Sequence, residues 1–140
     1  MNIKRLLGHN ILLTLVVVLT AMVTWASLAK FINPVTFTIE GSDKIGHFIA
    51  YFTLTIAWTL FFFFSEKMNK SLKQSLIITS MICILYGVLM EVLQAVLTTY
   101  RSSDWYDVVA NTSGTIFAVL VFVVFKSRIV RFKQNKQEVR

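Results

Sequence analysis

The chain has 140 residues, of which 56% are hydrophobic and only 15% are charged. Soluble globular domains carry about 25% charged residues, so this chain lacks the polar surface that a soluble domain of its length needs. The formal net charge of +7 is compatible with nucleic-acid binding, but eleven of the fourteen Lys and Arg residues lie in short segments that flank apolar runs. That arrangement is typical of membrane proteins, and we expect no nucleic-acid partner.

Four apolar runs are each long enough to cross a bilayer core, which takes about 20 helical residues. They cover about residues 8–29, 47–64, 76–97 and 105–125. We therefore predict an all-α, polytopic integral membrane protein with four transmembrane helices in a single domain. The first run also resembles a secretory signal peptide, because Lys4 and Arg5 precede it, but it is longer than the usual apolar region of about 7–15 residues.

The basic residues also predict the orientation of the helices, because cytoplasmic segments are enriched in Lys and Arg. Eleven of the fourteen lie before the first run, between the second and third runs, or in residues 126–140, and three lie in the other two connections. We expect a multi-pass protein of the cell membrane with both termini in the cytoplasm. Residues 126–140 would then form a basic cytoplasmic tail.

Polar side chains gather at the predicted outer ends of the second, third and fourth runs. Ionisable groups in a bilayer are costly and need a reason to be there. Because residues three or four apart share a helix face, these side chains form three stripes: Asp43, His47 and Tyr51; Glu91 and Gln94; and Asp104, Asp107, Asn111 and Gly114. Three stripes of this kind can face one shared pocket, and Gly114 permits close helix packing.

Glu91 lies about 9 Å inside the predicted outer end of the third run, at 1.5 Å per residue. A carboxyl group at that depth should not face lipid. We expect it either to be paired with Arg101, Lys44 or His47, or to be protonated through desolvation. The sequence does not decide between these two states.

Three segments in this order resemble the pattern of VanZ-like membrane proteins. They are Asp-Lys-x-x-His-Phe-x-x-Tyr from Asp43, Glu-x-x-Gln from Glu91, and Arg-x-x-Asp-x-x-Asp-x-x-x-Asn-x-x-Gly from Arg101. The resemblance covers most of the chain and implies a protein of the bacterial cell envelope. The family is named for a protein that gives low-level teicoplanin resistance by an unsettled mechanism, so the resemblance implies a contribution to glycopeptide resistance through the outer polar pocket.

One hypothesis from these residues is an enzyme that acts on a lipid-linked or phosphate-bearing envelope precursor. His47 would be the general acid or base, and Glu91 or Asp107 would orient it. Arg101 and Lys44 would hold an anionic group. Residues of the motif expected to contact the ligand are Asp43, Lys44, Tyr51, Gln94, Arg101, Asp104 and Asn111.

Two other hypotheses stay open. The chain could be a non-enzymatic protein that binds a lipid headgroup, a glycopeptide-like ligand or another membrane protein, or the polar residues could form a network that only fixes helix pairing. Asp104 would in either case be suited to cap the fourth helix. A metal variant would use His47 with Asp43, Asp104 or Asp107 as nitrogen and oxygen ligands of a divalent cation. The sequence has no His-x-x-x-His or Glu-x-x-His pair, so we predict no metal and no cofactor. It indicates neither the oligomeric state nor whether a bond is broken.

Overall fold

The computed structural model describes residues 8–28, 42–97 and 104–138, and all regular structure within these ranges is helical. The helices are α2 (His9–Leu28), α3 (Ser42–Phe64), α4 (Leu72–Leu97), α5 (Trp105–Val124) and α6 (Lys126–Glu138). The first four of these are long and apolar enough to cross a membrane. The prediction of an all-α protein with four candidate membrane spans is confirmed.

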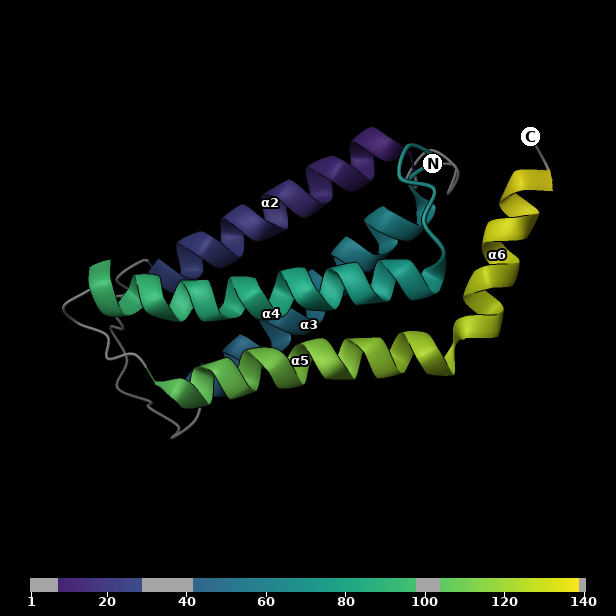
Figure 1. The fold of residues 1–140 in the computed structure, drawn as a ribbon. Coiled ribbons are helices and arrows are strands. Elements are labelled where there is room, and N and C mark those ends of the chain that lie inside the picture. Colours follow the sequence, from purple (N-terminus) through teal and green to yellow (C-terminus); the bar gives the residue numbers. More distant parts are fainter. Residues whose placement is uncertain (1–7, 29–41, 98–103, 139–140) are drawn as a thin grey trace.

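The four long helices lie side by side as a bundle, and α6 turns away from the end of α5 (Figure 1). The most extensive helix contacts join α3 to α5, and α3 also packs against α2 and α4. The start of α2, the connection between α3 and α4, and α6 all lie at one end of the bundle (Figure 1). The starts of α3 and α5 therefore meet the ends of α2 and α4 at the opposite end.

The bundle buries polar as well as apolar side chains and exposes many large apolar ones. Thr55, Thr59 and Thr79 are fully buried, whereas Leu85 is 66% exposed and Val96 is 74% exposed. A soluble bundle would bury the apolar side chains and expose the hydroxyls. Lipid is as apolar as these outer side chains, so the distribution is the one expected of helices that pack through small and polar residues in a bilayer.

Gly114 holds α5 directly against α3. A methyl group at this position would overlap the carbonyl oxygen of Phe48 and lie 3.0 Å from the backbone nitrogen of Phe52. Only a residue without Cβ lets the two backbones approach so closely. The predicted role of Gly114 in close helix packing is thereby confirmed.

Side chains define where two of the helices begin. At the start of α4, Gln74 N donates to Ser71 Oγ at 3.2 Å and Ser71 N donates to Gln74 Oε1 at 3.1 Å. This reciprocal pair is a capping box. At the start of α5, Asp104 accepts a hydrogen bond of 2.9 Å from the backbone nitrogen of Tyr106, as the predicted N-cap requires.

Two helices extend beyond the predicted spans, and the predicted tail contains a helix. Helix α3 begins at Ser42 instead of residue 47, and α4 begins at Leu72 instead of residue 76, because hydropathy does not detect a polar first turn. Residues 126–138, predicted only as a basic tail, form helix α6. Within α6, Lys133 donates to the carbonyl oxygen of Lys70 at 3.2 Å, which ties this helix to the connection between α3 and α4.

Candidate functional site

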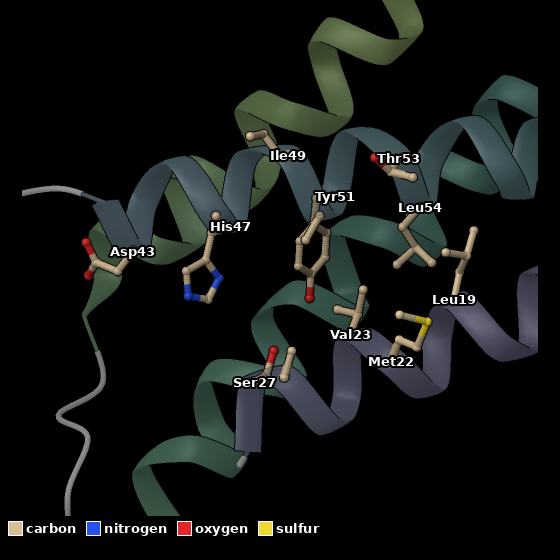
Figure 2. Close-up of a pocket in the computed structure, with 13 residues that line it drawn as sticks. Leu19, Met22, Val23, Ser27, Asp43, His47, Ile49, Tyr51, Thr53 and Leu54 are labelled. Carbon is tan, nitrogen blue, oxygen red and sulfur yellow. The ribbon is translucent and has the colours of Figure 1, made fainter. Parts of the chain in front are cut away.

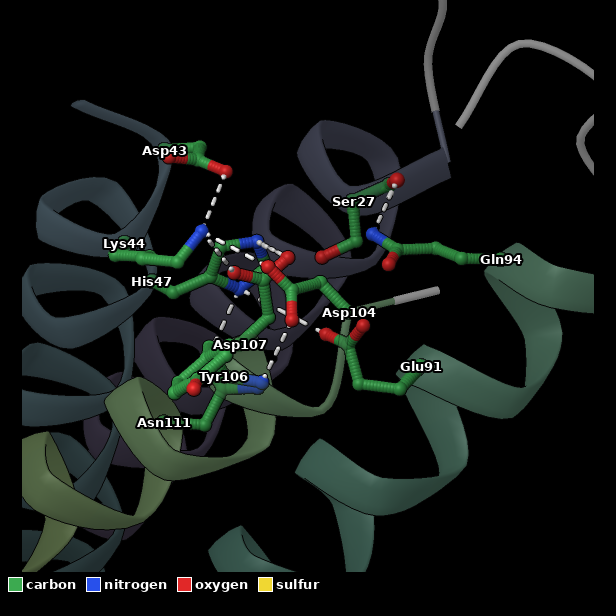
Figure 3. Close-up of polar contacts among 10 residues, drawn as sticks. All are labelled: Ser27, Asp43, Lys44, His47, Glu91, Gln94, Asp104, Tyr106, Asp107 and Asn111. Carbon is green, nitrogen blue, oxygen red and sulfur yellow. Dashed lines mark hydrogen bonds and ion pairs between the residues drawn. The ribbon is translucent and has the colours of Figure 1, made fainter. Parts of the chain in front are cut away.

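Three helices bring His47, Glu91 and Asp107 together (Figure 3). His47 and Asp107 lie near the starts of α3 and α5, at the end of the bundle opposite α6 (Figure 1). His47 Nδ1 lies 3.9 Å from Glu91 Oε1, and His47 Nε2 lies 3.6 Å from Asp107 Oδ2. All three residues are buried, with exposed fractions of 8%, 5% and 4%. We call these residues the acid–histidine cluster. A buried imidazole between two carboxyl groups can exchange protons with either of them.

Asn111 fixes the orientation of the His47 ring. It lies one helical turn beyond Asp107 on α5, and its Oδ1 is 3.1 Å from His47 Nδ1. An amide oxygen can only accept, so with this amide orientation the Nδ1–H of His47 donates to it. In the neutral imidazole the lone pair is then on Nε2, on the side that faces Asp107.

Lys44 connects the cluster to a group of more exposed acids. Its Nζ lies 3.0 Å from Asp104 Oδ2, 3.3 Å from Asp43 Oδ2 and 3.8 Å from Asp107 Oδ1. The pKa of Asp104 is lowered, first by the hydrogen bond from the backbone of Tyr106 and then by the Lys44 ammonium. Exposed ion pairs contribute little to stability, so this group is better suited to contacting a charged ligand than to holding the helices together.

The other predicted ligand-contacting residues have different surroundings. Gln94 Nε2 donates to the carbonyl oxygen of Ser27 at 2.8 Å, which joins α4 to α2. Tyr51 is fully buried, and its ring centre lies 6.1 Å from that of Tyr86. Arg101 lies outside the described residues. The roles of all these residues in binding or catalysis stay predictions.

An apolar pocket of about 440 Å³ lies between α2 and α3 and reaches the cluster (Figure 2). His47 and Asp43 line it near the start of α3, and Leu54 lines it about two to three turns further along the helix. Leu19, Met22 and Val23 contribute to the opposite wall, on α2. The sequence did not predict the α2 wall of the pocket, because apolar residues that line a pocket look the same in an apolar run as apolar residues that face lipid.

Gly46 contributes an open part of the pocket lining. A methyl group on this residue would meet no atom within 4 Å. A side chain added at Gly46 would therefore begin in open space at the edge of the pocket. The chemistry of the whole site is that of an apolar trough with acids, an imidazole and one ammonium group at its end, which suits an amphipathic molecule.

A four-span membrane bundle with a buried acid–histidine cluster at one end defines the class of this protein. The chain matches the VanZ/LLP1 family over residues 4–126, and it belongs to that family. An uncharacterised protein of the fission yeast Schizosaccharomyces pombe is 33% identical over 88 residues, which are 62% of this chain and 50% of the yeast protein. The chain thus spans about half the length of that relative. No solved structure matches the chain.

Proposed function

We propose that this VanZ/LLP1 family protein binds a lipid-linked, phosphate-bearing precursor of the cell envelope and breaks a bond in its headgroup. The observation that carries the proposal is the position of His47, which belongs to the acid–histidine cluster and also lines the apolar pocket. A ligand whose hydrocarbon chain fills the pocket therefore has its headgroup at the cluster.

The size and lining of the pocket support a lipid ligand. Its volume of about 440 Å³ is within the range of ligand pockets, about 300–1,000 Å³. Leu19, Val23 and Leu54 would contact the hydrocarbon chain. The Lys44 ammonium is placed to bind an anionic phosphate oxygen, because lysine is a common phosphate ligand.

The cluster supplies the groups that hydrolysis of a phosphate ester or anhydride requires. Water would attack phosphorus as His47 Nε2 removes its proton, and the bond from phosphorus to the leaving oxygen would break. The leaving oxygen then takes the proton from the imidazolium, which returns His47 to its neutral form. Asn111 holds the ring in position through Nδ1, and Asp107 Oδ2 lies 3.6 Å from the Nε2 that would take the proton.

The pocket test uses two substitutions at Gly46. Gly46→Phe should fill the pocket and abolish binding of a radiolabelled polyprenyl diphosphate to purified protein, whereas Gly46→Ala should retain binding, because its methyl group meets nothing within 4 Å. Equal binding by the two variants would mean that the lipid does not occupy this pocket.

A second candidate function is a contribution to teicoplanin resistance at the outer face of the cell membrane, with both termini cytoplasmic. It is supported by family membership and by the place of His47 and Asp107 near the starts of α3 and α5, which lie at the end of the bundle away from the basic helix α6 (Figure 1). Cells that express the wild-type chain should be resistant, and cells that express Glu91→Gln should not. Cells that express Glu66→Gln should stay resistant, because this control replaces an exposed glutamate in the connection between α3 and α4. Resistance that survives Glu91→Gln at equal protein level would contradict this role.

A further inference from the structure

We propose that His47, Glu91 and Asp107 form a binding site for one divalent transition-metal ion, such as Mn²⁺ or Zn²⁺. Each residue offers one ligand atom, and these atoms all lie within 4.8 Å of one another. The residues come from α3, α4 and α5, so no spacing along the chain reveals them as a set. One imidazole nitrogen and two carboxylate oxygens are a common donor set for these ions.

The distances are close to those of a bound ion. Ligand atoms that each lie about 2.1 Å from an ion can be at most about 4.2 Å apart. The pair from His47 Nε2 to Asp107 Oδ2, at 3.6 Å, is already within this limit, and one ligand atom from each of the three residues can be chosen so that all lie within 4.8 Å. A separation of 4.8 Å would need a closure of only about 0.6 Å, which a side-chain rotation supplies.

Two further polar atoms point to a ligand at this place. Asp107 Oδ1 is buried and accepts no hydrogen bond from any residue that the structure describes, and the Lys44 ammonium, its ion-pair partner, lies 3.8 Å away. The nearby amide nitrogen of Asn111 likewise donates to none of the described residues. Buried polar atoms normally have a hydrogen-bond partner. An ion at the cluster would coordinate the carboxylate of Asp107, and a water molecule on the ion would accept a hydrogen bond from Asn111.

Asn111 is also placed to orient a metal-binding histidine. Metal-binding histidines usually donate their other ring N–H to a protein oxygen, which fixes the ring and its tautomer. His47 Nδ1 is 3.1 Å from Asn111 Oδ1, which leaves Nε2 as the ligand atom beside Asp107. Three protein ligands leave coordination positions open, as in catalytic metal sites. An ion on Nε2 would occupy the nitrogen that the proposed hydrolysis uses as its base, so metal binding and that role of His47 are alternatives, whereas binding of the lipid is independent of either.

The experiment measures metal binding to the full chain in detergent. After removal of metals with EDTA, Mn²⁺ is added, and the free ion is followed by its electron paramagnetic resonance signal. Wild type should bind one Mn²⁺ per chain, Zn²⁺ should displace it, and both ions should raise the unfolding temperature. If the wild-type chain bound neither ion at one per chain, the proposal would be overturned, whatever the variants showed.

Matched variants then locate the site. Glu91→Gln and Asp107→Asn keep the side-chain shapes and should lower Mn²⁺ affinity at least tenfold, whereas Glu66→Gln should leave it unchanged. Asn111→Ala should lower affinity by about 10- to 100-fold, as expected of a residue that positions a ligand. Equal affinity of Glu91→Gln and Glu66→Gln would overturn the proposal. Metal binding by a protein that binds no polyprenyl diphosphate would support this site and refute the proposed function.

Discussion

Replacing Gly114 with alanine tests the closest contact in the bundle. The added methyl group would overlap the backbone oxygen of Phe48, which cannot rotate away as a side chain can. Overpacking costs about 1–3 kcal/mol, and we expect the upper end because backbone must move. Alanine gains about 1 kcal/mol over glycine in a helix. The net loss of unfolding free energy should therefore be about 2 kcal/mol, from about 3 of strain and about 1 of gain.

Gly46→Ala is the matched control, since the same methyl group there meets nothing within 4 Å. It should raise the unfolding free energy by up to about 1 kcal/mol. Both variants would be unfolded in mixed detergent micelles and followed by circular dichroism. Separation of α3 from α5 should also lengthen the contacts from His47 to Asp107 and Asn111. Equal stability of the two variants would refute the close packing of α3 on α5.

Three further changes test the interior and the site. Thr55→Val removes a buried hydrogen bond of 3.2 Å to Thr115 and should cost about 0.6 kcal/mol in mixed-micelle unfolding, the average for such bonds between membrane helices; no loss would make this bond energetically neutral. Gly87→Ala would place a methyl group 3.2 Å from the Tyr51 ring. Polyprenyl diphosphate binding should then weaken while folded yield is retained, and unchanged binding would show that the Tyr51 ring can move without affecting the ligand. Because the pKa of Asp104 is lowered in the folded state, its stabilising effect is full above about pH 4 and is lost at lower pH; Asp104→Asn should show a smaller loss of stability on acidification, and an unchanged loss would assign the acid sensitivity elsewhere.

The helical architecture could be predicted from sequence because a bilayer imposes one length on every span. Apolar runs therefore located α2, α3, α4 and α5 to within about five residues. The errors lie where polar residues continue a helix beyond the hydrocarbon, at Ser42 to Gly46 and at Leu72 to Ser75. Helix α6 was missed for the same reason, since a polar and basic helix has no hydropathy signal.

The candidate site could be predicted only in part. Helical spacing placed Asp43, His47 and Tyr51 on one face of α3, and the structure does direct His47 and Tyr51 to the same side (Figure 2). Spacing cannot show which residues of different helices meet. The sequence predicted a shared pocket and named His47 as a possible partner of Glu91, which the structure places 3.9 Å apart, but it did not reveal that Gln94 joins Ser27. Contacts of this kind depend on helix packing, which Gly114 sets between α3 and α5.

The most direct test of the proposed function is release of sugar phosphate from a polyprenyl diphosphate-linked saccharide by the purified chain in nanodiscs. Wild type and Glu66→Gln should release sugar phosphate at equal rates, and His47→Gln should be at least a hundredfold slower, the least expected for loss of a general acid or base, about 10²- to 10⁴-fold. Lipid binding by all three proteins would be measured alongside. Binding of the lipid with no release by wild type, or equal release by wild type and His47→Gln, would contradict the central claim that this cluster breaks a bond.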